Sequence, residues 1–271
     1  QLERWREELR HVLLAELTSG VIADARDKIA ADTVRGNKSR SAGTVNRYLA
    51  ALSHALKIAA EEWGWLEHLP MRSVRKCKEP QGRIRYLSSD EQERLLNACA
   101  ESSEPLLYPI VLVALLTGMR KGELLSLTWD RVDLERGRVF LDDTKNDERR
   151  GVALPQPARE QLERLRAEAP STGTYVFPNA SDTGPFQLRS SWERARETAG
   201  LENFRFHDLR HTTASYLAMN NASVAEIAAV LGHKSLQMTQ RYAHLSEDHT
   251  ADVVERMSAN FVAPTGSASR S

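Results

Sequence analysis

Apolar residues recur every three or four positions along most of the chain, and this period predicts a mainly helical protein. In the first third, the predicted helices cover about residues 2–17, 18–31 and 43–63. The polar and basic residues 33–42 interrupt the period and are expected to form a loop. The start of the chain is therefore expected to fold as a small helical domain.

A second set of predicted helices follows residue 87. Ser88 and Glu91 have the spacing of a capping box, in which each side chain accepts a hydrogen bond from the other residue's backbone N–H. The apolar run Leu106–Leu116 predicts a helix that ends at Gly118, and residues 119–125 predict a short helix after it. The remaining predicted helices cover about residues 157–168, 187–198, 207–218, 223–231, 236–244 and 246–257.

Between Trp129 and Leu154 the apolar period shifts towards two, which is typical of strands. Three short antiparallel strands are predicted over residues 131–134, 138–141 and 151–154, joined by a turn at 135–137 and a loop at 143–149. The fold class expected from these patterns is mainly α with a small three-stranded antiparallel sheet.

Proline, glycine and basic residues over 70–85 mark the boundary between two domains. We expect a helical domain over 1–78, a basic linker over 79–86, a second domain over 87–262 and a disordered tail over 263–271. Gln1 lies inside a predicted helix, so we expect that further residues precede it in the full protein.

Net charge gives no indication of a partner, because 37 Lys and Arg balance 37 Asp and Glu. Their distribution is more informative, since residues 33–60 and 68–78 contain cations and no acid. Such runs are often only a solvated surface, but they also suit a polyanion such as double-stranded DNA. The cations counted as candidate DNA contacts are Arg35, Lys38, Arg40, Arg47, Lys57, Arg72, Arg75, Lys76 and Lys78.

Cysteine and carboxylate spacing gives no indication of a metal site. Cys77 and Cys99 lack the spacing of metal ligands and are expected to be reduced thiols in a cytoplasmic protein. No apolar run is long enough to span a membrane, and no signal peptide is evident. We expect no metal, no cofactor and no membrane partner.

His207 and Arg210 are three residues apart on a predicted helix, so both side chains are expected on one face. A guanidinium matches the geometry of a phosphate, although such surface pairs are common and this pair alone is weak evidence. Tyr242 stands out among the six tyrosines, because its neighbours are polar, whereas Tyr48, Tyr108 and Tyr216 fall on apolar stripes expected in the core.

Five motifs together carry a resemblance to a known family. They are Thr117–Leu124 (TGMRKGEL), Thr144–Asn146 (TKN), His207–Thr212 (HDLRHT), Leu231–Ser235 (LGHKS) and Thr239–His244 (TQRYAH). In this order and spacing they resemble the catalytic motifs of the tyrosine recombinase, or phage integrase, family. Residues 1–78 resemble, less sharply, that family's core-binding domain, whereas the arm-binding domain of many integrases is not evident in this sequence.

The resemblance implies a role for each matching residue. Tyr242 would be the nucleophile that forms a 3′-phosphotyrosyl bond and frees a 5′-hydroxyl. Arg120, Arg210 and His233 would hold the phosphate oxygens, and His207 would assist as base or donor. Lys145 would be the general acid for the leaving oxygen, with Glu123 as a supporting acid. His211, Lys234 and His244 lie beside these motifs and either touch the site or support it.

These residue types suit phosphoryl transfer, because fixed cationic donors can stabilise the charge of its transition state. The resemblance implies a site-specific DNA recombinase that acts through a Holliday junction. It also implies a C-shaped two-domain DNA clamp and a homotetramer assembled through the C-terminal helix, with accessory DNA-bending proteins as further partners. The alternatives are a catalytically silent DNA-binding protein on the same fold and a type IB topoisomerase-like activity.

Overall fold

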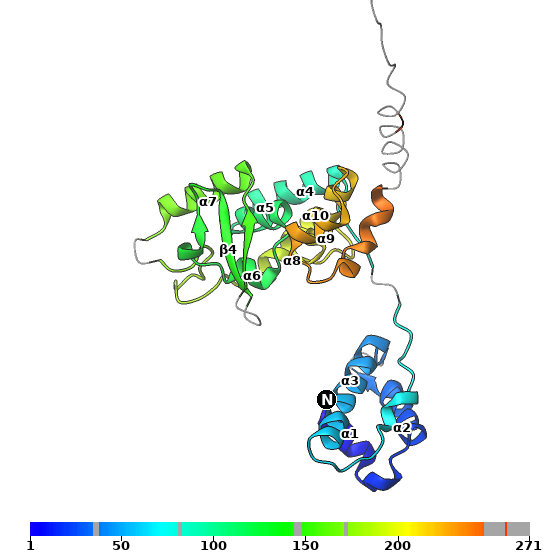
Figure 1. Cartoon of the computed structure of the whole chain (residues 1–271). Helices are drawn as coiled ribbons and strands as arrows, with labels where there is room; N and C mark the ends of the chain where they lie inside the picture. The colour runs from blue at the N-terminus through cyan, green and yellow to red at the C-terminus, as the bar shows by residue number, and fades with distance from the viewer. Residues whose placement is uncertain (35–37, 81–82, 144–147, 171–172, 247–257, 259–271) are drawn as a thin grey trace, which may run out of the picture. The chain divides into compact units, whose positions relative to one another are not determined.

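The computed structural model describes residues 1–34, 38–80, 83–143, 148–170, 173–246 and 258 (Figure 1). The chain forms two compact units, Gln1–Arg83 and Ile84–Ser271. Their division falls within the predicted linker, and each unit is described by itself. The described α-helices of the first unit are α1 (Leu2–Leu9), α2 (Ser19–Ala31) and α3 (Ala42–Glu61).

The core of the first unit lies between these helices and includes Trp5, Ile22, Ile29 and Leu49. The indole N–H of Trp5 donates to the Tyr48 carbonyl at 2.8 Å, which joins α1 to α3. The prediction of one helix over residues 2–17 is wrong. The chain turns after α1, and Leu13 is extended and 68% exposed, so its place in the apolar period does not bring it into the core.

Two segments of the first unit differ from the expected loop and linker. The predicted loop contains a small antiparallel pair, β1 (Thr33–Val34) with β2 (Lys38–Ser39). Asn46 on α3 accepts from Cys77 N (2.8 Å) and donates to the Glu79 carboxylate (2.7 Å), so the start of the predicted linker is fixed to this unit.

Helix α5 (Leu107–Thr117) organises the second unit, because it contacts α4, α6, α7 and α9 (Figure 1). Its sequence is apolar all round, as expected for a helix surrounded by others. It ends at Gly118 in the left-handed conformation, and α4 begins with the predicted capping box of Ser88 and Glu91. The other α-helices are α4 (Ser89–Ala100), α6 (Lys121–Leu125), α7 (Gln156–Glu168), α8 (Arg189–Thr198), α9 (Asp208–Met219) and α10 (Val224–Leu231).

The sheet has the predicted three antiparallel strands in the order β3–β4–β5, which confirms the fold class. The strands are β3 (Val132–Asp133), β4 (Arg138–Asp143) and β5 (Glu148–Ala153). Strand β5 begins earlier than predicted, because its pairing with β4 continues to Asp143 and Glu148. The inward side chains Val139 and Val152 are buried in the main core of this unit.

The predicted α-helix over 236–244 is instead two 3-10 segments, Leu236–Met238 and Gln240–Ser246. They are separated at the fully buried Thr239, whose hydroxyl bonds to His233 (2.7 Å). The predicted helix 246–257 and tail 263–271 lie, apart from residue 246, outside the described residues. Within the described part of the chain, no helix is both long and apolar enough to cross a membrane.

Candidate active site

Arg120 lies in the turn between α5 and α6, and Glu123 holds it in place. The Glu123 carboxylate accepts from the Arg120 backbone N–H (2.9 Å) and from its guanidinium (2.7 Å). Burial raises the pKa of Glu123, but these bonds and the nearby Arg150 charge outweigh it and lower the pKa overall. The other end of the Arg120 guanidinium donates to the Gly232 carbonyl at 3.3 Å, which links the turn to the end of α10.

Arg210 is buried inside α9, with only 4% of its surface exposed. Its Nη1 donates to the Gly118 carbonyl at 2.7 Å, while its Nη2 is buried with no hydrogen-bond partner among the described residues. Burial and the like charge of Arg120 lower the pKa of Arg210 to about 10, so it remains charged at neutral pH. A buried cationic donor without a partner is costly, and an anion would satisfy it.

His207 caps α9 and is exposed, whereas Arg210, three residues later, is buried. The His207 ring meets the His211 ring edge to face, with centroids 5.2 Å apart. Burial, and then the charge of Arg210, lower the pKa of His207.

Tyr242 is buried, with 2% of its surface exposed, in a small core with Ala214, Ala218 and Leu231. It is the most buried of the six tyrosines, so the sequence argument that contrasted it with core tyrosines was wrong about burial. Its hydroxyl makes a short hydrogen bond with Nδ1 of His211. Burial raises the pKa of Tyr242, and the charges of Arg241 and Arg210 partly offset this effect.

His233 follows Gly232, which ends α10 in the left-handed conformation. Its Nδ1 bonds to the Thr239 hydroxyl at 2.7 Å, and this bond fixes the orientation of the ring. Burial, with the charges of Arg210 and Arg120, lowers the pKa of His233 to about 4, so the ring is neutral at pH 7.

Arg150 on β5 is a candidate site residue that the sequence argument missed. Its guanidinium approaches Glu123 at 3.4 Å. It also packs against Gly232, where an added Cβ would overlap the Arg150 guanidinium. A longer predicted strand would have revealed it, because Arg150 shares the inward face with the buried Val152 and Leu154.

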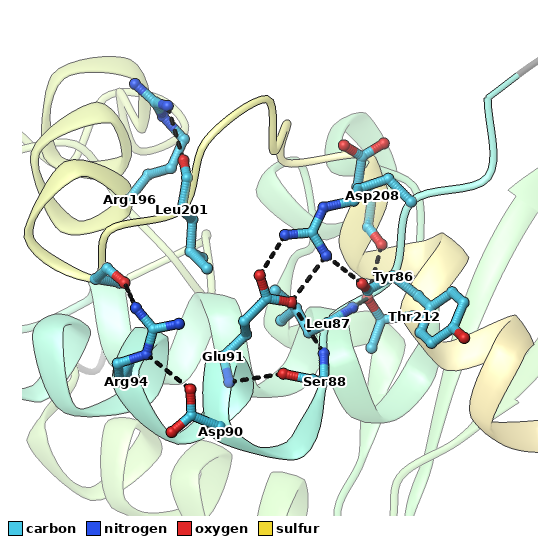
Figure 2. Close-up of polar contacts among 12 residues, drawn as sticks. Tyr86, Leu87, Ser88, Asp90, Glu91, Arg94, Arg196, Leu201, Asp208 and Thr212 are labelled. Carbon is cyan, nitrogen blue, oxygen red and sulfur yellow. Dashed lines mark hydrogen bonds and ion pairs between the residues drawn. The ribbon is translucent and has the colours of Figure 1, made fainter.

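A polar cluster fixes the first turn of α9 to the chain segment that enters the second unit (Figure 2). Thr212 Oγ1 donates to the Asp208 carbonyl (2.9 Å) and accepts from Leu87 N (3.1 Å). Beside it, Arg85 donates to Glu91 at 2.8 Å. The helix that carries Arg210 and His211 is therefore held at its start by residues far away in the sequence.

The other predicted site residues are described only in part. Lys145 lies between β4 and β5, outside the described residues, as does Arg35, and the Lys38 side chain is not described. Arg40 is half-buried and paired with Asp32 at 3.5 Å, so an acid just before its acid-free segment neutralises it. The remaining candidate DNA contacts are exposed: Arg47, Lys57, Arg72, Arg75, Lys76 and Lys78.

Three guanidinium groups, those of Arg120, Arg150 and Arg210, thus lie around Glu123, Gly118 and Gly232, near two neutral histidines and a buried phenol. Such an arrangement can hold a tetrahedral anion such as a phosphate diester. Among the residues that the structure describes, no cluster of three or more His, Cys, Asp or Glu could hold a metal ion.

The two neutral histidines predict how stability depends on pH. Burial lowers the pKa of both His211 and His233 from 6.5 to about 4, so between these values the unfolded chain binds protons that the folded chain does not. The free energy of unfolding should therefore fall as the pH is lowered from 6.5 to 4, by at most about 1.4 kcal/mol per pH unit for each histidine, and by less where solvent screens it. Urea unfolding at several pH values measures this, and His233→Gln should reduce the slope.

Comparisons with known proteins agree with this geometry. The phage integrase family profile matches residues 85–249. The shufflon-specific DNA recombinase of Escherichia coli is 37% identical over 232 residues, which are 85% of this chain and 58% of that protein. The integrase of Salmonella phage P22 is 29% identical over 239 residues, 83% of this chain and 59% of that protein. The chain thus spans less than two thirds of the length of these relatives.

Solved structures show the same fold. The catalytic domain of bacteriophage HP1 integrase is 29% identical, with a TM-score of 0.52 over 64% of this chain and 95% of that one. The XerH site-specific recombinase, solved bound to a palindromic difH substrate, is 20% identical with a TM-score of 0.75 over 93% of this chain and 76% of that one, and shows the fold alone.

Proposed function

The chain belongs to the phage integrase family, and from this premise we propose that it cleaves and rejoins double-stranded DNA at specific sites. In this proposal Tyr242 attacks a backbone phosphate, forms a 3′-phosphotyrosyl bond and releases a 5′-hydroxyl. The freed hydroxyl of another strand then attacks that bond, which completes strand exchange through a Holliday junction without an external energy source.

The observation that carries the proposal is the placement of Tyr242 beside a buried, unsatisfied cation. The Arg210 charge acts on the Tyr242 phenol, and the Nη2 of Arg210 has no hydrogen-bond partner among the described residues. A phosphate that bonds to this nitrogen would lie close to the phenolic oxygen. The proposed nucleophile and the group that would bind the anion would therefore lie in one place once the phosphate has entered.

We assign the remaining candidate residues to separate roles according to their positions. Arg120, held by Glu123, and His233 would donate to the non-bridging oxygens, and Arg150 would reinforce the positive field. His207, exposed at the start of α9, would contact the phosphate from the solvent side. Lys145, which follows β4 in the sequence, would give its proton to the leaving 5′ oxygen.

The first unit would bind DNA through its exposed cations on α3 and on residues 70–78. For the active assembly we propose a homotetramer on two DNA duplexes, in which the C-terminal residues after 246 contact a neighbouring protomer. Deleting residues 247–271 should then weaken assembly on paired sites more than binding of one protomer to one site.

Covalent mapping on DNA tests the proposed function. The protein would be incubated with a randomised duplex library that carries a nick, so that cleavage releases a short strand and traps the adduct. The trapped ends would be sequenced, and protection of 3′ ends but not 5′ ends from exonucleases would show the polarity of attachment. We expect 3′ adducts at one recurrent sequence. Adducts without sequence preference would favour topoisomerase-like relaxation, and absence of adducts would favour a silent DNA-binding protein.

A further inference from the structure

We propose that His211 is the base that takes the proton from Tyr242 when the phenol attacks, and returns it when the strand is rejoined. This inference rests on the proposed function and assigns a residue that the sequence motifs did not place in the reaction. Its basis is contact, because Nδ1 of His211 is hydrogen-bonded to the Tyr242 hydroxyl. The two ring centroids are 5.9 Å apart.

His207 is the alternative base, and its position is less suitable. It caps α9 and is exposed, and its ring meets the edge of His211. No described hydrogen bond joins His207 to Tyr242. His211 lies one helical turn later and points to the 3-10 segment that carries the tyrosine.

The hydroxyl of Tyr242 has a possible proton acceptor on one side and positive charges nearby. In the proposed step His211 accepts this proton through Nδ1, so the neutral imidazole carries its own proton on Nε2. The charges of Arg241 and Arg210 act on the same phenol and favour its anionic form. One neighbour can therefore remove the proton while two cations stabilise the oxygen that remains.

The groups around His211 keep it neutral and able to accept. Burial and the neighbouring His207 lower its pKa to about 4, with further contributions from Arg241 and Arg210, whereas Asp208 opposes the shift. The charge of His211 in turn contributes to the lowered pKa of His233, at the end of α10. A bound phosphate diester adds a negative charge among these cations, so the imidazolium that forms during attack is less costly than in the free protein.

The proposed step balances in bonds and protons. The O–H bond of Tyr242 breaks and its proton moves to Nδ1 of His211, while the phenolic oxygen forms a bond to phosphorus. The bond from phosphorus to the 5′ oxygen breaks, and that oxygen takes a proton from the general acid. In the reverse step a 5′-hydroxyl attacks the phosphorus and gives its proton back to the general acid, the bond from phosphorus to the Tyr242 oxygen breaks, and His211 returns its proton to the departing phenol.

The variant His211→Asn separates proton transfer from positioning. The asparagine Oδ1 can replace Nδ1 as a hydrogen-bond acceptor, but an amide cannot take up the proton. In single turnover on a trapping substrate, we expect adduct formation to slow by about 10²-fold at pH 7, with DNA affinity unchanged. The rate should also keep rising with pH, because hydroxide must remove the proton. His11→Asn, the same change at an exposed histidine of the first unit, should match the wild type.

Two further experiments distinguish a base from a general acid and from a residue that only positions Tyr242. A substrate with sulfur at the 5′ bridging position needs no general acid, so it should restore Lys145→Ala but not His211→Asn. A near-wild-type rate for His211→Asn, with a slow His211→Ala, would mean that the histidine only positions Tyr242 and would overturn the proposal.

A measurement without DNA tests the contact itself. With tyrosine labelled at Cζ, the NMR signal of Tyr242 should shift as His211 titrates, and this shift should be absent in His211→Asn. No such coupling would overturn the proposal even if adducts form. If the coupling is present but the wild type forms no adduct on any DNA, the proposed function fails, and the role of His211 fails with it.

Discussion

Tyr242→Phe should abolish covalent attachment to DNA, with a loss of about 10⁴-fold or more, while DNA binding survives. The change removes one oxygen, which is the proposed nucleophile, and no other hydroxyl among the described residues bonds to His211. The aromatic ring still fills its buried site, so the free energy of unfolding should change by about 1 kcal/mol, the value of one hydrogen bond. Denaturing gels of trapped complexes and binding assays on intact duplex measure the two effects.

Tyr216→Phe is the matched control for this variant. It makes the same chemical change on α9, at a half-buried tyrosine whose hydroxyl lies 3.5 Å from that of Ser89. Adduct formation should remain close to that of the wild type. Adducts formed by Tyr242→Phe, at any appreciable rate, would show that another residue is the nucleophile.

Arg210→Lys should slow adduct formation by about 10²- to 10³-fold, although the positive charge is kept. The guanidinium donates to the Gly118 carbonyl with one nitrogen and leaves the other for a ligand. A lysine ammonium is a single point of charge. It can therefore donate to the carbonyl or to the phosphate, but not to both in the geometry of the guanidinium. Single-turnover rates on the trapping substrate measure the loss.

Arg196→Lys is the control for the structural part of this effect. Arg196 on α8 also donates to a backbone carbonyl, that of Leu201, at 3.0 Å. Both variants should lose a similar amount of stability in urea unfolding, but only Arg210→Lys should lose activity. Equal activity of the two variants would contradict a role of Arg210 in holding the phosphate.

Periodicity predicted most of the second unit because its helices have strong local signals. Ser88 with Glu91 marks the start of α4, and Gly118 with Gly232 ends α5 and α10, as their left-handed conformations require. The error at residues 2–17 has a tertiary cause. Apolar spacing continues past Leu9, but the chain must turn there to pack α2 against α3, and spacing alone carries no information about that turn.

The site could be predicted as a set of residues but not as an arrangement. Motif spacing selected Arg120, Arg210, His233 and Tyr242, whose contacts lie up to 112 residues apart in the chain. It did not predict that Arg210 and Tyr242 are buried, since burial depends on neighbouring elements. It also did not place Arg150, because its strand was predicted to begin at residue 151 and begins three residues earlier, at Glu148.

The covered position of Tyr242 limits when this protein could act on DNA. With 2% of the residue exposed, the phenolic oxygen is stored inside the fold rather than displayed on the surface. A duplex that binds only at the protein surface would contact cations but not the phenolic oxygen. Under the proposed function, breakage must wait until the 3-10 segment shifts or the phosphate penetrates to the oxygen. The rate at which the phenol becomes accessible would then be the upper limit on the rate of strand cleavage. DNA that dissociates before this happens would not be cut.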